Sequence, residues 1–521
     1  MAKSPVWAAL VLLAAAACGA AAEPSASPHA AVRPVTAGEV RWTGGFWKDR
    51  FDACRTATLP HLWRVMSGTE YSQFLENFRV AAGRAEGRHR GAVFNDGELY
   101  KWVEAASAVY AATRDPALLP PLDEAVAAIR AAQRPDGYLH TKIQTRQRQG
   151  DPEAQEFRDP LQFEAYNLGH LMTAACVHHR ATGKPDLLDA ARKAADYLDR
   201  LSQNATPDFA RSAVCPSHYM GLVELYRETR EPRYLKLAER LVALRDTVHG
   251  GTDDNQDRIP LRRQTKAVGH AVRANYLYAG VADLVLETGD PTLRPPLTAV
   301  WDDVVATKLS VTGGCGALYD GASPDGAADQ KSIARVHQAY GRDYQIPNAT
   351  AHNETCAAVG LALWSWRMLQ LTGGAKHADM LERVLYNAAP AGVSLDGTRF
   401  FYTNPLRLSD PPPADLRWPR ERRPFLSSFC CPPNLARTIA ESAGYAYGKS
   451  DRGVWVHLYG ASELTTDLPG GGRLTLTQAT DYPWDGRVRL TIAVDRPATF
   501  SLFLRIPTWA AGRSGFAGYP A

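Results

Sequence analysis

Most of the chain shows the apolar spacing of amphipathic helices. Between residues 98 and 112 the apolar side chains recur three and four positions apart, as on one buried helix face, at Leu99, Trp102, Val103, Ala106 and Val109. Similar spacing, interrupted by Gly and Pro, predicts helices at roughly 51–67, 97–113, 117–133, 162–182, 186–203, 216–229, 232–246, 268–288, 293–308, 351–372, 375–391 and 434–446. Two interruptions share the pattern Thr-Gly-x-Pro, a faint internal repeat.

Helices that follow one another as hairpins fit an (α/α)6 barrel, in which inner and outer helices alternate. We therefore predict a mainly α fold with a barrel domain over residues 38–447, preceded by a short strand and turn at 40–47. Loops at one end of such a barrel would hold a functional site, because loops tolerate polar residues that a packed wall does not.

The pattern changes near residue 448. Four segments then alternate apolar and polar residues with period two and are separated by Gly- and Asp-rich turns, which predicts strands at 454–459, 473–477, 487–492 and 500–504. We predict a β-sandwich domain over 448–521 that is incomplete at its C-terminal end. An incomplete sandwich would leave an open sheet edge, which is prone to association.

The N-terminus has the pattern of an export signal. Lys3 precedes an apolar run from Val6 to Ala17, which is too short to span a bilayer and is followed by small residues. We predict a signal peptide at 1–22, a linker rich in Ala, Pro and Ser at 23–37, and a secreted or periplasmic protein. Cys18 is an alternative lipid-attachment site, although the usual large aliphatic residue three positions before it is missing.

Composition and charge are those of an ordinary globular protein. The 521 residues are 45% hydrophobic and 22% charged, with a net charge of +4. Without a basic cluster interleaved with aromatic residues, nothing indicates a nucleic-acid partner. The charge-dense stretch 417–423 fits a solvated loop, and a site for an acidic substrate is the alternative.

The candidate chemistry lies in two short segments, 351–356 and 429–434. They contain one carboxylate and three thiols, which is a complete set of ligands for tetrahedral zinc, namely Glu354, Cys356, Cys430 and Cys431. Glu354 and Cys356 cannot share one helix face, but they can converge from a loop or a helix start. Adjacent cysteines do not form a relaxed disulfide with each other. The alternative is that these are ordinary buried cysteines.

Export raises the question of disulfide bonds for the other cysteines. Cys176 lies within an apolar helical pattern, which indicates a core position. The pattern does not decide whether Cys54, Cys215 and Cys315 pair.

Several motifs together resemble glycoside hydrolase family 127, the β-L-arabinofuranosidase family. In chain order they begin at Asp136 (DGYLH), Gly169 (GHL), Gly269 (GHAVR), Tyr344 (YQIPN), Asn353 (NETC), Phe401 (FYTNP) and Cys430 (CCPPN). The resemblance runs from about residue 38 to the end of the chain, and it implies the (α/α)6 barrel as well.

The resemblance also implies roles for individual residues. Glu354, Cys356, Cys430 and Cys431 would bind Zn²⁺, with Cys430 as the nucleophile of a retaining hydrolase. A metal-bound thiolate is the reactive form of cysteine. The resemblance implies that three histidines contact a sugar, whereas for a lone His a structural role is more usual: His140, His170 and His270. Tyr402 is a weaker candidate for the pocket wall or for a hydroxyl contact.

One position departs from the family pattern. The general acid/base of the family is a Glu sixteen residues before the ligand Glu, and here that position is Gln338. An amide cannot transfer the proton. His337 or Asp343 would then supply it, the substrate would carry its own acid, or the chain would bind sugar and turn it over poorly.

We therefore predict an exported, zinc-dependent glycoside hydrolase that acts on β-L-arabinofuranosyl or a related rare sugar of plant cell walls. Two other classes remain open. One is a catalytically silent carbohydrate-binding protein with a structural zinc, and the other is a polysaccharide lyase, which would not need the Cys430 thiolate.

Overall fold

The structure is a computed structural model that describes residues 27–322, 335–411 and 416–511. The predicted signal peptide, including Cys18, lies outside the described residues. So do residues 23–26 of the predicted linker.

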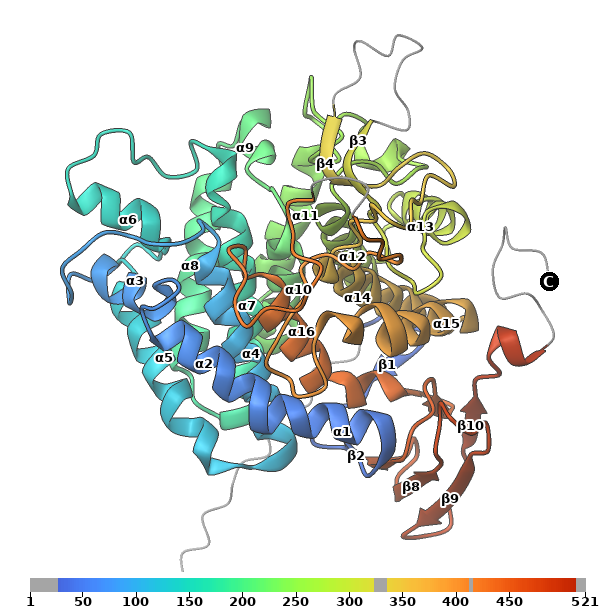
Figure 1. The fold of residues 1–521 in the computed structure, drawn as a ribbon. Helices are drawn as coiled ribbons and strands as arrows, with labels where there is room; N and C mark the ends of the chain where they lie inside the picture. The colour runs from blue at the N-terminus through green and yellow to red at the C-terminus, as the bar shows by residue number, and fades with distance from the viewer. Residues whose placement is uncertain (1–26, 323–334, 412–415, 512–521) are drawn as a thin grey trace, which may run out of the picture.

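Six helices form a closed inner ring (Figure 1). Each contacts the next along the chain, and the last contacts the first: α4 (Asn95–Thr113), α7 (Glu164–Thr182), α10 (Ser217–Thr229), α12 (Ala271–Thr288), α14 (Thr355–Thr372) and α16 (Cys431–Ala440). A helix of the outer layer precedes each of them: α2 (Leu59–Ser67), α5 (Leu119–Ala132), α8 (Asp186–Ser202), α11 (Pro232–Arg245), α13 (Arg294–Thr307) and α15 (Ala375–Arg383). This alternation confirms the predicted (α/α)6 barrel.

The sequence pattern differs between the two layers for a physical reason. The outer helix α8 buries one stripe, which includes Leu187, Ala191 and Leu198, as expected for a helix with one face in solvent. The inner helix α4 is buried at almost every position from Asn95 to Val109, because it packs on all sides. Since outer helices carry the chain back, all inner helices begin at the same mouth of the barrel.

The structure also contains helices that the sequence pattern did not predict. The predicted helix 51–67 is two helices, α1 (Gly45–Ala53) and α2, joined by a π-helical turn at Cys54–Thr58. Three short helices lie in connections: α3 (Phe74–Ala81), α6 (Thr141–Arg148) and α9 (Pro207–Arg211).

Two four-stranded sheets follow the barrel. Their orders are β1-β5-β6-β10 and β2-β7-β8-β9. The strands are β1 (Arg33–Pro34), β2 (Val40–Trp42), β5 (Tyr447–Ser450), β6 (Gly453–Val456), β7 (Ser462–Asp467), β8 (Arg473–Ala479), β9 (Arg489–Val494) and β10 (Ser501–Leu504). All pairs are antiparallel except β6 with β10. The predicted small β-sandwich is thus confirmed, and β7 is a strand that the pattern missed.

The N-terminal segment belongs to these sheets. β1 pairs with β5, and β2 pairs with β7, while Val32 and Val35 are buried. The described part of the predicted linker is therefore not a free linker, because its backbone is paired and its valines are in the core.

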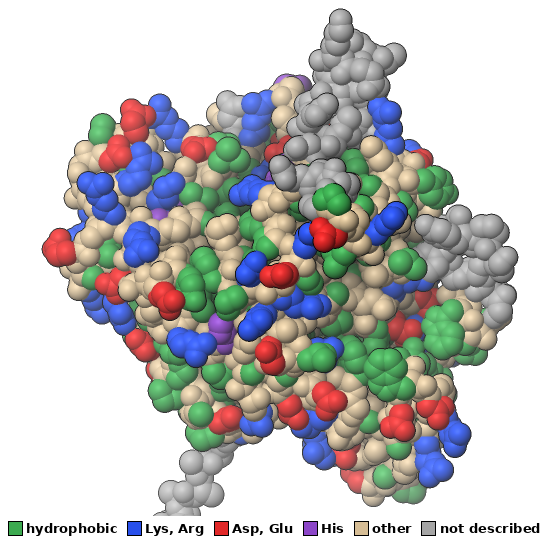
Figure 2. Space-filling view, in the orientation of Figure 1, with side chains coloured by type: hydrophobic (Ala, Val, Ile, Leu, Met, Phe, Trp, Pro, Cys, Tyr) green, Lys and Arg blue, Asp and Glu red, His purple; other side chains and the backbone are tan. Residues whose placement is uncertain are grey.

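The distribution of surface charge and the state of the cysteines fit a globular protein with free thiols. Acidic and basic side chains are interspersed over the face seen in Figure 2, without a large patch of one sign. The seven described cysteines are free thiols, and Cys176 is fully buried in α7, as predicted. No helix in the described ranges has the length and hydropathy needed to cross a bilayer.

Candidate active site

The four predicted ligands lie at the first turns of two inner helices. Glu354 is the N-cap residue of α14, and Cys356 is its second residue. Cys430 is the N-cap residue of α16, and Cys431 is its first residue. Helix N-termini favour negative charge, so both helices stabilise a carboxylate and thiolates at this mouth of the barrel.

The four side chains converge. Glu354 Oε1 lies 3.4 Å from Cys430 Sγ and 3.7 Å from Cys431 Sγ. Cys431 Sγ lies 3.4 Å from Cys356 Sγ and 3.8 Å from Cys430 Sγ. One donor atom from each residue lies within 4.8 Å of all the others. The structure therefore brings together the complete predicted ligand set.

The donor set fits a metal ion. Glu354 is buried, and its Oε2 atom accepts no hydrogen bond. Burial, followed by the neighbouring Cys430, raises the pKa of Glu354 well above its usual range. Burial would also raise the pKa of Cys356, but hydrogen bonds from Cys430 and Cys431 outweigh it and lower that pKa to about 6. Four acidic groups crowd one buried site, and a cation would let all four ionise.

A buried charged group lies beside the cluster. Lys101 of α4 has no exposed side-chain surface, and its Nζ donates to Glu98 Oε2 at 2.9 Å and to the hydroxyl of Tyr166. Charge on Glu98, and then on Tyr276, Cys356 and Cys430, raises the pKa of Lys101 above its usual value despite burial. Lys101 therefore supplies positive charge next to the thiols. Sequence reasoning missed this residue, whose signal was a Glu-x-x-Lys pair inside an otherwise buried helix.

Gln338 lies at the edge of the cluster and is buried. It is in β4 (Arg335–Ala339), which pairs with β3 (Leu318–Ala322). Its Nε2 donates to Tyr402 Oη at 2.8 Å, and Ala339 bridges to His270. Burial, Arg273 and His352 hold the pKa of His270 well below its usual range, against a hydrogen bond with Gln338 that raises it. The structure thus places Gln338 between two of the predicted sugar-contact residues.

An aromatic wall adjoins Gln338. Tyr402 stacks on Trp418 with ring centroids 3.8 Å apart. His352, which sequence reasoning missed, lies 5.9 Å from Tyr402 and 4.7 Å from Tyr319 between ring centroids. His352 is fully buried, and neither of its ring nitrogens has a partner.

The other two predicted histidines lie elsewhere. His140 caps α6: its Nδ1 accepts from Ile143 N at 3.2 Å, so its Nε2 carries the proton and donates to Gln162 O at 2.9 Å. His170 packs edge-on against Tyr166 and Tyr276 in the barrel interior. Their contact with a sugar stays a prediction, and the contacts of His140 are those of a structural residue.

Cys215 was also not singled out by sequence reasoning. It has a left-handed backbone, with φ 51°. Burial raises the pKa of its thiol against the charges of Arg273 and Lys101, and charge on Cys356 and Glu354 adds to the rise. A left-handed non-glycine residue beside a functional cluster is a known form of local strain. Only its position in the fold reveals it.

The comparisons with known proteins agree with this geometry. A family model described as the β-L-arabinofuranosidase GH127 catalytic domain matches residues 39–444, and one described as the GH127 middle domain matches residues 453–516. Fold and site thus define a glycoside hydrolase built on a helical barrel. The chain belongs to glycoside hydrolase family 127.

Similar proteins are found among both sequences and structures. The non-reducing end β-L-arabinofuranosidase of Bifidobacterium longum subsp. longum is 32% identical over 90% of this chain and 75% of its own length. A solved GH127 β-L-arabinofuranosidase from Geobacillus stearothermophilus T6 is 34% identical, with a TM-score of 0.80 over 90% of this chain and 75% of that one. A solved structure described as a glycoside hydrolase is 48% identical, with a TM-score of 0.80 over 93% of this chain and 72% of that one.

Proposed function

We propose that the chain is an exported, zinc-dependent, retaining glycosidase that releases β-L-arabinofuranosyl or a related rare sugar from plant cell-wall glycans. The observation that carries this proposal is the convergence of Cys430 with Glu354, Cys356 and Cys431 at one mouth of the barrel. The β-L-arabinofuranosidase activity of the Bifidobacterium and Geobacillus relatives supports the choice of sugar.

Zinc suits the donor set better than hard cations do. Thiolate sulfur favours zinc over magnesium or calcium, which take oxygen ligands. Glu354, Cys356, Cys430 and Cys431 would hold the ion. When bound, zinc supplies positive charge that keeps the thiols ionised at neutral pH.

Cys430 is placed to act as the nucleophile. It is the one thiol of the cluster that retains partial exposure, so a sugar can reach its sulfur. Its thiolate attacks the anomeric carbon, a carbon–sulfur bond forms, and the aglycone leaves with the electron pair of the glycosidic bond and takes up a proton. Water then displaces the sulfur, loses a proton and restores the thiolate. Two inversions give net retention.

The residue that protonates the leaving group has still to be assigned, because the amide of Gln338 cannot donate that proton. Asp343 is poorly suited, since it is a partly exposed ion-pair partner of Lys266, whose hydrogen bond lowers the pKa of Asp343. His337 lies nearer the site, with its ring centroid 5.7 Å from that of His352. We therefore assign the proton to His337, and His337→Gln should slow release of sugar leaving groups.

Removing one thiol should remove the metal. Cys356→Ser replaces a thiolate with a hydroxyl, which stays protonated at neutral pH and binds zinc weakly. We expect purified wild-type protein to contain about one zinc per chain by elemental analysis and Cys356→Ser to contain little. Cys54→Ser is the matched control, because Cys54 is a buried thiol that donates to Ala436 O and is not part of the cluster. Equal zinc in all three proteins would contradict the assignment.

Gln338→Glu should increase activity on poor leaving groups. The substitution is isosteric, and Tyr402 Oη can reverse its hydrogen bond from acceptor to donor. A general acid contributes about 10²- to 10⁴-fold. Because His337 already donates a proton, we expect the gain in kcat/KM on arabinofuranosyl oligosaccharides to lie below that range. The gain should be smaller on a p-nitrophenyl arabinofuranoside, whose leaving group needs little protonation. A loss on both substrates would indicate a site adapted to Gln.

One observation favours a carboxylated sugar as the second candidate substrate. The guanidinium of Arg417 lies over Trp418, 4.9 Å from the ring centroid, and Trp418 stacks on Tyr402. Arg417 forms no ion pair within the described residues, so it can pair with a substrate carboxylate near Gln338. Comparing release from acidic wall oligosaccharides before and after carboxyl reduction separates the two substrate classes.

A silent sugar-binding protein is the remaining alternative, since family membership provides no support for a lyase. Binding of arabinofuranosides without release of sugar from any of the substrates above would establish it. Export is tested separately, by N-terminal sequencing of protein from culture medium and periplasm. We expect a mature chain that begins near residue 23, and a lipid on Cys18 would instead show anchoring.

A further inference from the structure

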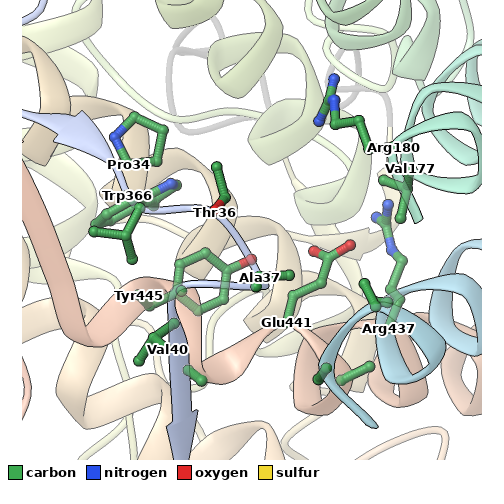
Figure 3. A pocket seen from close by; sticks show the side chains of 18 of the residues that line it. Pro34, Thr36, Ala37, Val40, Val177, Arg180, Trp366, Arg437, Glu441 and Tyr445 are labelled. Atoms are coloured by element: carbon green, nitrogen blue, oxygen red, sulfur yellow. The ribbon is translucent and has the colours of Figure 1, made fainter. Parts of the chain in front are cut away.

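Apart from the cysteine cluster, the structure contains a cavity inside the barrel, called the second cavity here (Figure 3). Its volume is about 1180 Å³. Its walls are side chains along the inner helices, from Ser217 at the start of α10 to Glu441 after the end of α16, together with residues between 33 and 42 of the N-terminal segment. On α14, Cys356 belongs to the cysteine cluster and Trp366 to the cavity. Ten residues of helix separate them by about 15 Å, and none of the four cluster residues lines the cavity.

A hydrogen-bonded layer lies between the two sites. Arg437 Nη1 donates to Glu104 Oε1 at 3.0 Å, and Arg437 Nη2 donates to Tyr276 Oη at 3.2 Å. His170 lines the cavity beside Tyr276, is 1% exposed, and has no partner at either ring nitrogen. Burial, then Lys101 and Arg437, holds the pKa of His170 well below its usual range. A neutral imidazole with both nitrogens available therefore faces this cavity.

Other polar groups around the cavity also lack partners. Within the described residues, the carboxyl of Glu441 makes no hydrogen bond or ion pair, although it points into the cavity near Arg180 and Arg437 (Figure 3). Across from it, the Tyr445 hydroxyl and the Trp366 indole N–H likewise donate to no described atom, and each residue is 7% exposed. Buried polar groups are usually hydrogen-bonded, and the ring nitrogens of His170 are buried without a partner. Together with the carboxyl, the hydroxyl and the indole N–H, they offer unused donors and acceptors to a polar occupant.

The charges around the cavity are largely balanced, which limits the class of ligand. Arg180 pairs with Glu224 and Glu228, and Arg437 pairs with Glu104. A cation would meet these arginines, and an anion would meet the carboxylates. A neutral ligand with many hydroxyls can bond Glu441, His170, Tyr445 and Trp366 at once, and its apolar face can pack on the two aromatic rings.

We propose that this cavity is a second carbohydrate site, which binds a neutral mono- or disaccharide and takes no part in hydrolysis. Burial, followed by the charge of Glu104, raises the pKa of Glu441 to about 8, so its carboxyl can both donate and accept near neutral pH. The cavity reaches solvent beside the exposed residue Arg41, which provides a route of entry.

The chain offers a side-chain position that can fill the cavity without strain. Gly444 lines it, has an ordinary backbone conformation, and a Cβ added there would meet only Val35 O, at 4.0 Å. Gly444→Leu should therefore occupy cavity space while leaving the fold intact. Gly486→Leu is the matched control, because a Cβ at Gly486 meets no atom within 4 Å and Gly486 does not line the cavity. Glu441→Gln is a second, isosteric variant.

The test is equilibrium dialysis of radiolabelled L-arabinose against the full chain. We expect two sites per chain, with the second in the millimolar range, and one site in Gly444→Leu. Glu441→Gln should weaken the second site at least about tenfold, whereas Gly486→Leu and Cys430→Ser should keep it. Hydrolysis should be unchanged in Gly444→Leu, so failure of the proposed hydrolase and failure of this site are separate results.

Two outcomes would overturn the proposal. One is identical arabinose binding by Gly444→Leu, Glu441→Gln and Gly486→Leu. The other is a cavity that binds a charged ligand instead. In that case spermidine or galacturonate would protect the wild type, but not Gly444→Leu, against thermal unfolding, and L-arabinose and xylobiose would protect neither.

Discussion

Replacing Cys430 by serine is expected to lower kcat for arabinofuranoside hydrolysis by about 10⁴- to 10⁶-fold, the scale seen when an enzyme loses its nucleophile. Serine is nearly isosteric, but its hydroxyl does not ionise near neutral pH. Because Cys430 keeps partial exposure while its three cluster neighbours are buried, its sulfur is the one a sugar can approach. Single-turnover kinetics on an activated arabinofuranoside measure this loss.

The control for this result is Cys54→Ser, which changes a thiol without touching the cluster. It should keep kcat within about twofold, as is usual for substitutions away from the reacting groups. Mass spectrometry adds an independent readout, since a slow substrate should leave a sugar on Cys430 of the wild type. Retained hydrolysis in Cys430→Ser, with the sugar found on another residue or on none, is incompatible with a thiolate nucleophile.

Replacing Lys101 by methionine is expected to destabilise the fold by about 3–5 kcal/mol, the cost of leaving one partner of a buried ion pair alone. Lys101 and Glu98 have no exposed side-chain surface and lie 2.9 Å apart. Met fills similar volume but cannot pair with Glu98. Urea unfolding at pH 8 measures the loss of free energy of unfolding.

The double variant Lys101→Met/Glu98→Leu is the control, because it removes both charges. Its stability should return to within about 1–2 kcal/mol of the wild type.

The stability of Lys101→Met should also depend on pH, with a definite sign. Burial raises the pKa of Glu98 to about 7, so the folded state holds a proton that the unfolded state loses near pH 4.5. Stability of Lys101→Met should therefore fall as pH rises from about 4.5 through 7 and beyond. A loss that is equal at pH 5.5 and 8 would mean that Glu98 is not the cause.

The helices were predictable where apolar spacing determines them. Segments such as 186–203, with one apolar stripe, lie within a residue or two of α8. The short helix α6 could not be predicted in this way, because its sequence from Thr141 to Arg148 has no apolar stripe. It forms because His140 caps it and because Asp96 accepts from Thr141 N and Thr141 Oγ1. The contacts with Asp96 join residues 45 positions apart, so no local sequence pattern predicts them.

The cysteine cluster could be predicted from the sequence because it is local. Its four residues occupy two short segments at helix starts, and their identities alone define a ligand set. Lys101, His352 and Cys215 were missed because their importance comes from what the barrel brings beside them. His170 matches a family motif and lines the second cavity, and its contact with the sugar at the active site stays a prediction. The position of a residue along an inner helix decides which end of the barrel its side chain faces. Helix boundaries predicted from sequence are too imprecise to determine that position.

The pairing of β2 with β7 joins Val40 to Leu464 in register. On a ribosome, the first of these strands emerges more than four hundred residues before its partner, so this sheet cannot close until Leu464 has been made. The helical hairpins can fold one by one during that time, whereas the N-terminal segment has to remain unpaired. Because the same segment lines the second cavity, the walls of that cavity are completed only after the barrel helices and the strands that pair with this segment have been made.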